Sequence, residues 1–255
     1  MCFQSMNQNG DSMSRTRIFQ SASLEPHSNL RLDENASHHL ARVLRAKIDD
    51  TLTLFNGNGN EYEAVISHID KKGVDVEIKN SKPCDTESPI DIYLAQGIAR
   101  GEKMDFIVQK AVELGVKKIF PLITERCNVR LEGEREDKRL RHWQSVIVSA
   151  CEQSGRARLP EMTAPQTLTE WLAGVQANLC FVLSPYAQDK LPTTAFAHAS
   201  IVLLIGPEGG LSDNEISLAT QKDFKPVNLG PRILRTETAT VAALTAIQFR
   251  YGDFG

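Results

Sequence analysis

The sequence has few features that point to a membrane, a metal or a disulfide framework. No apolar run approaches the roughly 20 residues that span a bilayer, and the longest candidate, residues 201–205, has the length of a strand. The five cysteines form no CxxC pair and the six histidines form no HxxxH pair. Zinc sites and disulfide scaffolds therefore lack support. We expect no metal, no membrane partner and a reducing, cytoplasmic setting.

The sequence also lacks an excess of basic residues. The 255 residues carry 29 Lys and Arg against 32 Asp and Glu, which gives a net charge of −3, so nucleic-acid binding would have to rest on local clusters. The contents of 41% hydrophobic and 24% charged residues are ordinary for a globular protein and exclude collagen, coiled coil and global disorder. Neither GxxxxGK[ST] nor a GxGxxG after a strand occurs, which disfavours P-loop enzymes and dinucleotide-dependent dehydrogenases.

The N-terminal third is predicted to be rich in β-structure. Residues 1–12 are polar and lack an apolar centre, so we expect a disordered leader, with Met13 as the natural start. Residues 13–82 hold short segments of alternating hydrophobicity separated by turns rich in Gly, Asn and Lys, which predicts a small barrel.

One helix is expected to interrupt these strands, at residues 38–45. Its apolar side chains at Leu40, Val43 and Leu44 have the spacing of one buried helix face.

The remainder of the chain has the pattern of an α/β domain. Residues 80–89 contain two prolines and few large apolar side chains, which is typical of a linker. After them, strand-like segments alternate with helix-like ones, which predicts a parallel sheet over residues 83–255. Ser212 and Glu215 have the spacing of a capping box and predict the start of a helix.

Two glycine-containing loops carry the strongest functional signal. Residues 204–210, LIGPEGG, follow an apolar strand, and residues 229–239, LGPRILRTETA, follow a short one. Ligands of open α/β sheets bind beyond the carboxyl ends of strands, and glycine lets the backbone approach a ligand closely. A plain strand-to-helix turn is the alternative for each loop. Their presence after consecutive strands favours one shared pocket.

These loops, with four further segments, resemble the bacterial 16S ribosomal RNA (uracil-N3)-methyltransferases of the SPOUT superfamily. The further segments are HHLARVLR at 38–45, KAVELG at 110–115, TER at 124–126 and EQSGR at 152–156. The resemblance extends from about residue 14 to the C-terminus, although Ser184 to Tyr186 depart from the family pattern. It implies a PUA-like RNA-binding β-barrel, a SPOUT methyltransferase domain with a C-terminal trefoil knot, and a homodimer that acts on 16S ribosomal RNA or the small ribosomal subunit.

The resemblance also implies a site for S-adenosylmethionine. The residues expected to line it are Ile205, Gly206, Gly210, Leu229, Gly230 and Leu234. For RNA, the cations expected to contact phosphates are Arg15, Arg17, Arg42 and Arg45.

The chemistry of uracil N3 suggests five catalytic candidates. N3 lies on the pairing edge, must be exposed by unpairing or flipping, and must lose its proton. Nearby positive charge would stabilise the resulting anion, for which the candidates are Arg126, Arg156 and Arg235. Glu113 or Glu208 could orient groups or accept the proton. Each arginine has the alternative of a surface salt bridge, and Glu113 that of helix-end capping or an internal ion pair.

Two other functions remain open at this point. One is a SPOUT methyltransferase with another RNA target. The other is a catalytically silent RNA-binding protein of the same fold, against which the intact pair of glycine-containing loops argues.

Overall fold

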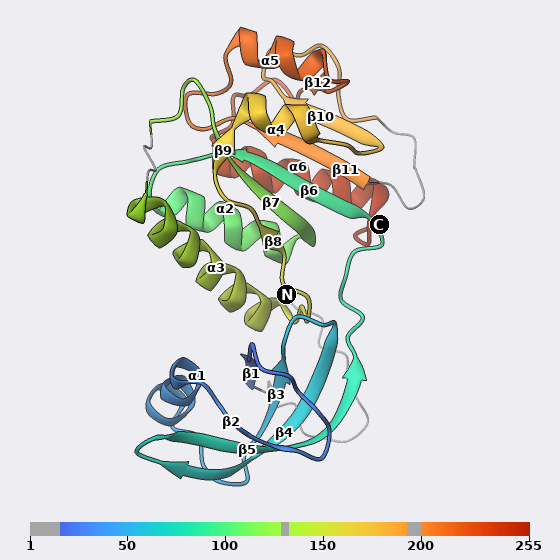
Figure 1. The fold of residues 1–255 in the computed structure, drawn as a ribbon. Coiled ribbons are helices and arrows are strands. Elements are labelled where there is room, and N and C mark those ends of the chain that lie inside the picture. Colours follow the sequence, from blue (N-terminus) through green and yellow to red (C-terminus); the bar gives the residue numbers. More distant parts are fainter. Residues whose placement is uncertain (1–15, 129–132, 193–199) are drawn as a thin grey trace. The chain divides into compact units, whose positions relative to one another are not determined.

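The computed structural model describes residues 16–128, 133–192 and 200–255 (Figure 1). The expected leader and Arg15 lie outside the described residues. The chain divides into two compact units between Asp85 and Thr86, three residues after the border expected from the sequence. Each unit is described by itself.

The first unit is built on one five-stranded sheet with the strand order β1-β3-β4-β5-β2. Its strands are β1 (Thr16–Phe19), β2 (Asn29–Arg31), β3 (Thr51–Phe55), β4 (Asn60–Asp70) and β5 (Gly73–Pro83). Buried and exposed residues alternate along β4 and β5, as the period-two pattern predicts. The sequence did not predict β2, and β5 includes residues 80–83, which were expected to belong to a linker.

The helical segment of this unit corrects one prediction. It consists of α1 (Glu34–His38) followed by a π-helical turn, η1 (His39–Leu44). Leu40 is buried, but Val43 is 60% exposed and Leu44 is 45% exposed. The predicted common face assumed the α-helical period, whereas a π turn takes more residues for each rotation. Val43 and Leu44 therefore leave the face on which Leu40 packs.

The second unit contains a seven-stranded sheet in which every pair of strands is parallel. Its main order is β12-β10-β11-β6-β7-β8, and β9 also pairs with β7. The strands are β6 (Asp91–Gly97), β7 (Val116–Ile123), β8 (Glu161–Met162), β9 (Gln166–Thr167), β10 (Leu179–Leu183), β11 (Ser200–Ile205) and β12 (Lys225–Val227). This arrangement confirms the predicted parallel α/β fold.

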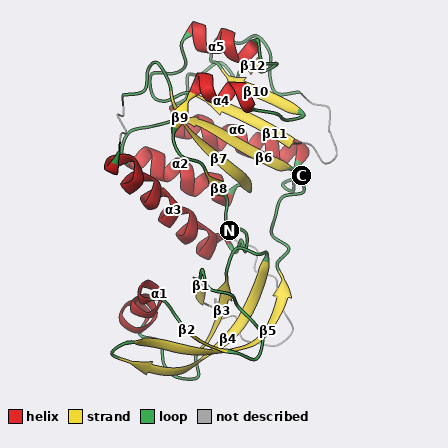
Figure 2. Ribbon diagram, viewed as in Figure 1, coloured by secondary structure: helices red, strands yellow, loops and turns green. Residues whose placement is uncertain are grey.

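Helices cover both faces of this sheet. Figures 1 and 2 show α2, α3 and α6 on one side and α4 and α5 on the other. Their bounds are α2 (Glu102–Glu113), α3 (Glu134–Ser154), α4 (Leu168–Gly174), α5 (Asp213–Thr220) and α6 (Thr236–Tyr251). The capping box of Ser212 and Glu215 is present at the start of α5, whereas the short α4 was not predicted. Within the described residues, no helix combines the length and apolar character needed to cross a membrane.

Candidate functional site

The main candidate site is a cavity of about 430 Å³ at the carboxyl ends of β10, β11 and β12. These strands are neighbours in the sheet, so the loops that follow them converge at one edge. The volume lies in the range of small-molecule sites. The loops that supply most of its wall are residues 183–186, 205–211 and 227–234.

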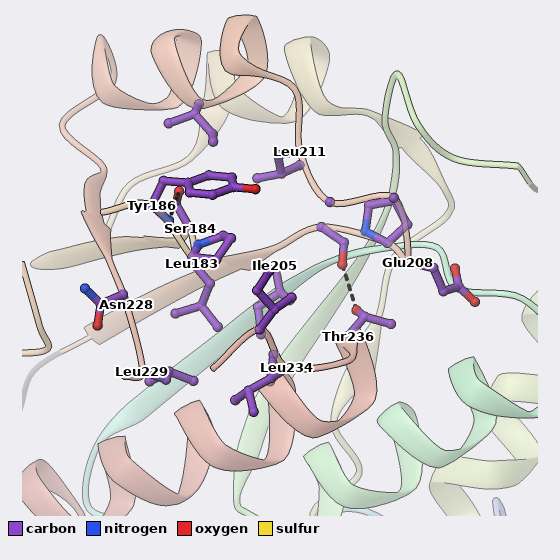
Figure 3. Close-up of a pocket in the computed structure, with 18 of the residues that line it drawn as sticks. Leu183, Ser184, Tyr186, Ile205, Glu208, Leu211, Asn228, Leu229, Leu234 and Thr236 are labelled. Carbon is purple, nitrogen blue, oxygen red and sulfur yellow. Dashed lines mark hydrogen bonds between the residues drawn. The ribbon is translucent and has the colours of Figure 1, made fainter. Parts of the chain in front are cut away.

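All six residues expected to hold a cofactor line this cavity. Figure 3 shows the apolar side chains of Ile205, Leu229 and Leu234 gathered together with Leu183. They offer an apolar wall, and backbone groups of the glycine loops supply hydrogen-bonding atoms beside it. A flat heterocycle with a polar edge is the kind of group that this combination accommodates.

Two of the glycines are required by backbone conformation. Gly210 has a φ of +70° and Gly230 a φ of +118°, both in the region that other residues rarely adopt. The space beside each of them is open, because a Cβ at either position would have no neighbouring heavy atom within 4 Å. The backbone of both loops can therefore come into contact with a bound molecule.

A buried polar network supports the loop after β11. The Thr236 hydroxyl donates to the Gly206 carbonyl at 2.7 Å (Figure 3), and Gln96 Nε2 donates to the same carbonyl at 3.3 Å. The Thr240 hydroxyl donates to Gln96 Oε1 at 2.8 Å. These residues were missed in the sequence. The available signal was a glutamine near the end of a strand, directly after the apolar residues Leu94 and Ala95.

Arg126 and Glu208 also line the cavity. Arg126 donates to the carbonyls of Gly209 and Leu211, at 3.1 and 3.3 Å, which holds its positive charge beside the glycine loop. Glu208 accepts from the Arg100 backbone N–H at 3.1 Å and pairs with Lys103 at 3.3 Å. In Figure 3 its side chain extends away from the other labelled residues.

The environment of Glu208 favours its ionised form. Burial opposes the charge, but hydrogen bonds from the backbone N–H groups of Glu208 and Arg100, together with the Lys103 ammonium, outweigh it and lower the pKa of the carboxyl group. A carboxylate with a lowered pKa is a weak proton acceptor, so its position suits an orienting role better than that of a base.

The structure does not bring the other three catalytic candidates to the cavity. Arg156 is 3% exposed, forms an ion pair with Glu87 at 2.6 Å and donates to the carbonyls of Val112 and Val116. Glu113 pairs with Lys110 at 2.7 Å. Arg235 is exposed at the N-cap of α6, and neither it nor the other two is a lining residue. Arg156 thus forms an ion pair, but a buried one and not the surface salt bridge considered as its alternative, whereas Glu113 forms the ion pair considered as one of its alternatives.

A different arginine of the same loop lies at the cavity in place of Arg235. Arg232 lines the cavity on the same loop. The two arginines are three residues apart, and only the path of the loop decides which of them lines the cavity.

The four RNA candidates have different surroundings. Arg17 is engaged within the first unit, because it pairs with Glu61 and lies over the Phe55 ring at 5.1 Å. Arg42 and Arg45 are exposed on and directly after η1. Arg15 is outside the described residues.

Comparisons with known proteins define the class of this fold and site. The family described as "RNA methyltransferase domain" matches residues 86–248, and that described as "RNA methyltransferase PUA domain" matches residues 32–79. A methyltransferase structure from Legionella pneumophila with bound cofactor SAM has 40% identity and a TM-score of 0.90, covering 95% of this chain and all of that one.

Two relatives make the assignment more particular. Ribosomal RNA small subunit methyltransferase E of Buchnera aphidicola (from Schizaphis graminum) is 37% identical over 93% of this chain and 97% of its own. The Neisseria gonorrhoeae protein of that name, crystallised with S-adenosyl methionine, has 38% identity and a TM-score of 0.88 over 94% of this chain and all of its own. The chain belongs to the ribosomal RNA small subunit methyltransferase E family.

A metal centre has no support in the described part of the chain. Residues 16–128, 133–192 and 200–255 contain no group of three or more His, Cys, Asp or Glu side chains placed to hold an ion.

Proposed function

We propose that this protein is an S-adenosylmethionine-dependent methyltransferase that methylates N3 of a specific uridine in 16S ribosomal RNA. The observation that carries the proposal is the convergence of the two glycine-containing loops on one cavity with an apolar wall. The relatives from Legionella and Neisseria that contain the bound cofactor support it, because they match nearly the whole chain.

The residues present fit the cofactor. The open space beside Gly210 and Gly230 leaves backbone groups accessible to the adenine edge, and Ile205, Leu229 and Leu234 supply apolar contacts for its ring. When bound, S-adenosylmethionine supplies an electrophilic methyl group on a sulfonium centre. No ionisable side chain is needed to hold the adenine ring in this arrangement.

The cations at the cavity have a role in activating the uracil. Removal of the N3 proton places negative charge on the ring and its two carbonyl oxygens. Arg126, held by the carbonyls of Gly209 and Leu211, is positioned to stabilise that charge without reorganisation. Arg232 lines the same cavity and adds a second positive charge. Glu208 fixes the loop between β6 and α2, through the Arg100 backbone N–H, against the glycine loop and so helps to keep this geometry.

The wider assembly follows from the same proposal. We infer a trefoil knot around residues 205–236 and a homodimer acting on the small ribosomal subunit in the cytoplasm. Tyr186 and Ile233 support a covering partner, since both line the cavity while being 79% and 76% exposed. Light scattering of the purified protein measures the dimer directly.

Cofactor binding tests the cavity. Leu234→Ala removes apolar contact and is expected to weaken S-adenosylmethionine binding roughly tenfold, as the loss of about 1.5 kcal/mol of burial predicts. Calorimetry measures the dissociation constant. Leu44→Ala, a substitution of the same type at an exposed leucine of the first unit, should leave it unchanged. Equal affinities for both variants and the parent would contradict this assignment.

The reaction itself is tested on ribosomal RNA from cells that lack the protein. Mass spectrometry of its nucleosides should show loss of 3-methyluridine from the 16S fraction, restored by the purified protein with S-adenosylmethionine. Loss of a different methylated nucleoside would favour another RNA target. Unchanged nucleosides, together with absent cofactor binding, would favour a silent RNA-binding protein.

A further inference from the structure

A second cavity lies in the methyltransferase unit, beside the start of α2. It has a volume of about 270 Å³ and is separate from the cofactor site. Its chemistry-bearing lining residues are Arg100, Asn128, Arg139 and Trp143. Arg139 and Trp143 are four residues apart on α3, so they lie on one face of that helix.

The donors around this cavity lack acceptors. Trp143 is 1% exposed, and its Nε1 has no hydrogen-bond partner among the described residues. Buried N–H groups are nearly always paired, so an unpaired one needs an explanation. Within the described residues, the half-buried Arg139 has no acceptor or ion-pair partner for its guanidinium group, whereas the half-buried Arg17 is ion-paired. Arg100 is exposed at the mouth of the cavity and adds a second cation there.

The start of α2 borders this cavity. Gly101 is its N-cap and provides no capping side chain, and the Glu208 carboxylate accepts from the Arg100 backbone N–H beside it. In the first turn, Asp105 is hydrogen-bonded to His142 at 2.8 Å. Because Glu102, Asp105 and Glu208 do not line the cavity, the two guanidinium groups and the indole N–H there favour an anion.

The second cavity is linked to the cofactor site through adjoining loops. β6 and β11 are paired up to Gln96 and Ile205, and Gly97 packs so closely on Pro207 that a Cβ would stand 2.5 Å from its ring. The Arg100 backbone N–H then donates to Glu208, a lining residue of the cofactor cavity. The loops that border the two cavities are therefore in direct contact.

We propose that Arg100, Arg139 and Trp143 form a subsite for a backbone phosphate of the RNA, next to the nucleotide that is methylated. The inference rests on the proposed function and adds a substrate contact to it. A nucleotide turned out of its stack must be held by its flanking backbone, and phosphate contacts supply that positioning. Because the chain has a net charge of −3, such attraction has to come from local clusters.

Methylation kinetics test the subsite. The double variant Arg100→Gln with Arg139→Gln should raise KM for the RNA at least about tenfold, leave the dissociation constant of S-adenosylmethionine unchanged, and reduce the slope of log affinity against log salt by about 1. Arg135→Gln with Arg141→Gln is the matched control, since it removes the same two charges from exposed positions on α3. An Arg100→Gln, Arg139→Gln protein with the KM and slope of this control would overturn the proposal.

A binding assay separates this result from failure of the methylation reaction. In a Trp171→Phe background Trp143 is the single tryptophan, and its fluorescence should change on addition of a uridine trinucleotide but not in the Arg100→Gln, Arg139→Gln variant. Inorganic phosphate alone should bind far more weakly. Equal binding of inorganic phosphate would identify a free-phosphate site and overturn the RNA assignment, as would no response to either probe. If the parent protein responds to the trinucleotide but methylates no RNA, the proposed function fails while the subsite stands.

Discussion

At the scale of single residues, Arg156 shows how burial separates structural from catalytic arginines. Its guanidinium group is enclosed by Glu87 and by two carbonyls at the end of α2 and the start of β7, each at 2.9 Å. A charge held this way is satisfied before any substrate arrives. Arg126, by contrast, donates through one nitrogen to two carbonyls at the rim of a cavity. Within the described residues its other N–H groups remain available to a ligand.

Substitution of Arg156 should therefore affect stability rather than chemistry. Arg156→Met leaves Glu87 and the carbonyls of Val112 and Val116 without their donor, which is expected to cost about 3 kcal/mol of unfolding free energy. Denaturant unfolding measures this loss, while KM for the RNA and the cofactor affinity of the folded protein should stay unchanged.

The control for this experiment is Arg158→Met, a nearby exposed arginine, which should change the unfolding free energy by no more than about 0.5 kcal/mol. A stable Arg156→Met protein with strongly reduced kcat would contradict the structural role and return Arg156 to the catalytic candidates.

At the scale of elements, prediction from the sequence succeeded where local rules decide the conformation. The capping box at Ser212 and the apolar strand at residues 201–205 each depend on a few neighbouring residues. Both are present. The prediction for residues 38–45 was wrong because hydrophobic spacing does not distinguish a π turn from an α-helix. Val43 and Leu44 have the spacing of core residues but are exposed.

In the candidate site, too, the features set by neighbouring residues were predictable and those set by distant contacts were not. Its two glycine-containing loops were recognisable because glycine, proline and the preceding strand occur together. Gln96 and Thr236 were not, since their hydrogen bonds join residues that are 140 positions apart in the chain. The pairing of β6 with β11 brings Gln96 to the Gly206 carbonyl, and the start of α6 brings Thr236 there. No local pattern encodes these contacts.

At the scale of the whole molecule, the two units have separate hydrophobic cores. One cluster extends from Ile18 to Ile78, within the first unit. Another, from Ala95 to Phe224, joins the sheet of the second unit to α4 and α5. Every residue that lines the cofactor cavity belongs to the second unit, and so do those of the phosphate subsite. The exposed arginines of η1 belong to the first unit.

This separation predicts that cofactor and RNA binding can be divided between the units. A protein of residues 86–255 should fold and bind S-adenosylmethionine within about threefold of the affinity of the full chain, because its core and cavity are complete. Its affinity for RNA should fall, since Arg42 and Arg45 are removed with the first unit and each lost phosphate contact weakens binding and its salt dependence.

Calorimetry and filter binding over a range of salt concentrations measure the affinities for the cofactor and for RNA. The variant Arg42→Gln with Arg45→Gln in the full chain tests the two arginines alone. If the shortened protein kept the RNA affinity and salt slope of the full chain, the exposed arginines of η1 would have no part in binding, and the contacts would have to lie within residues 86–255.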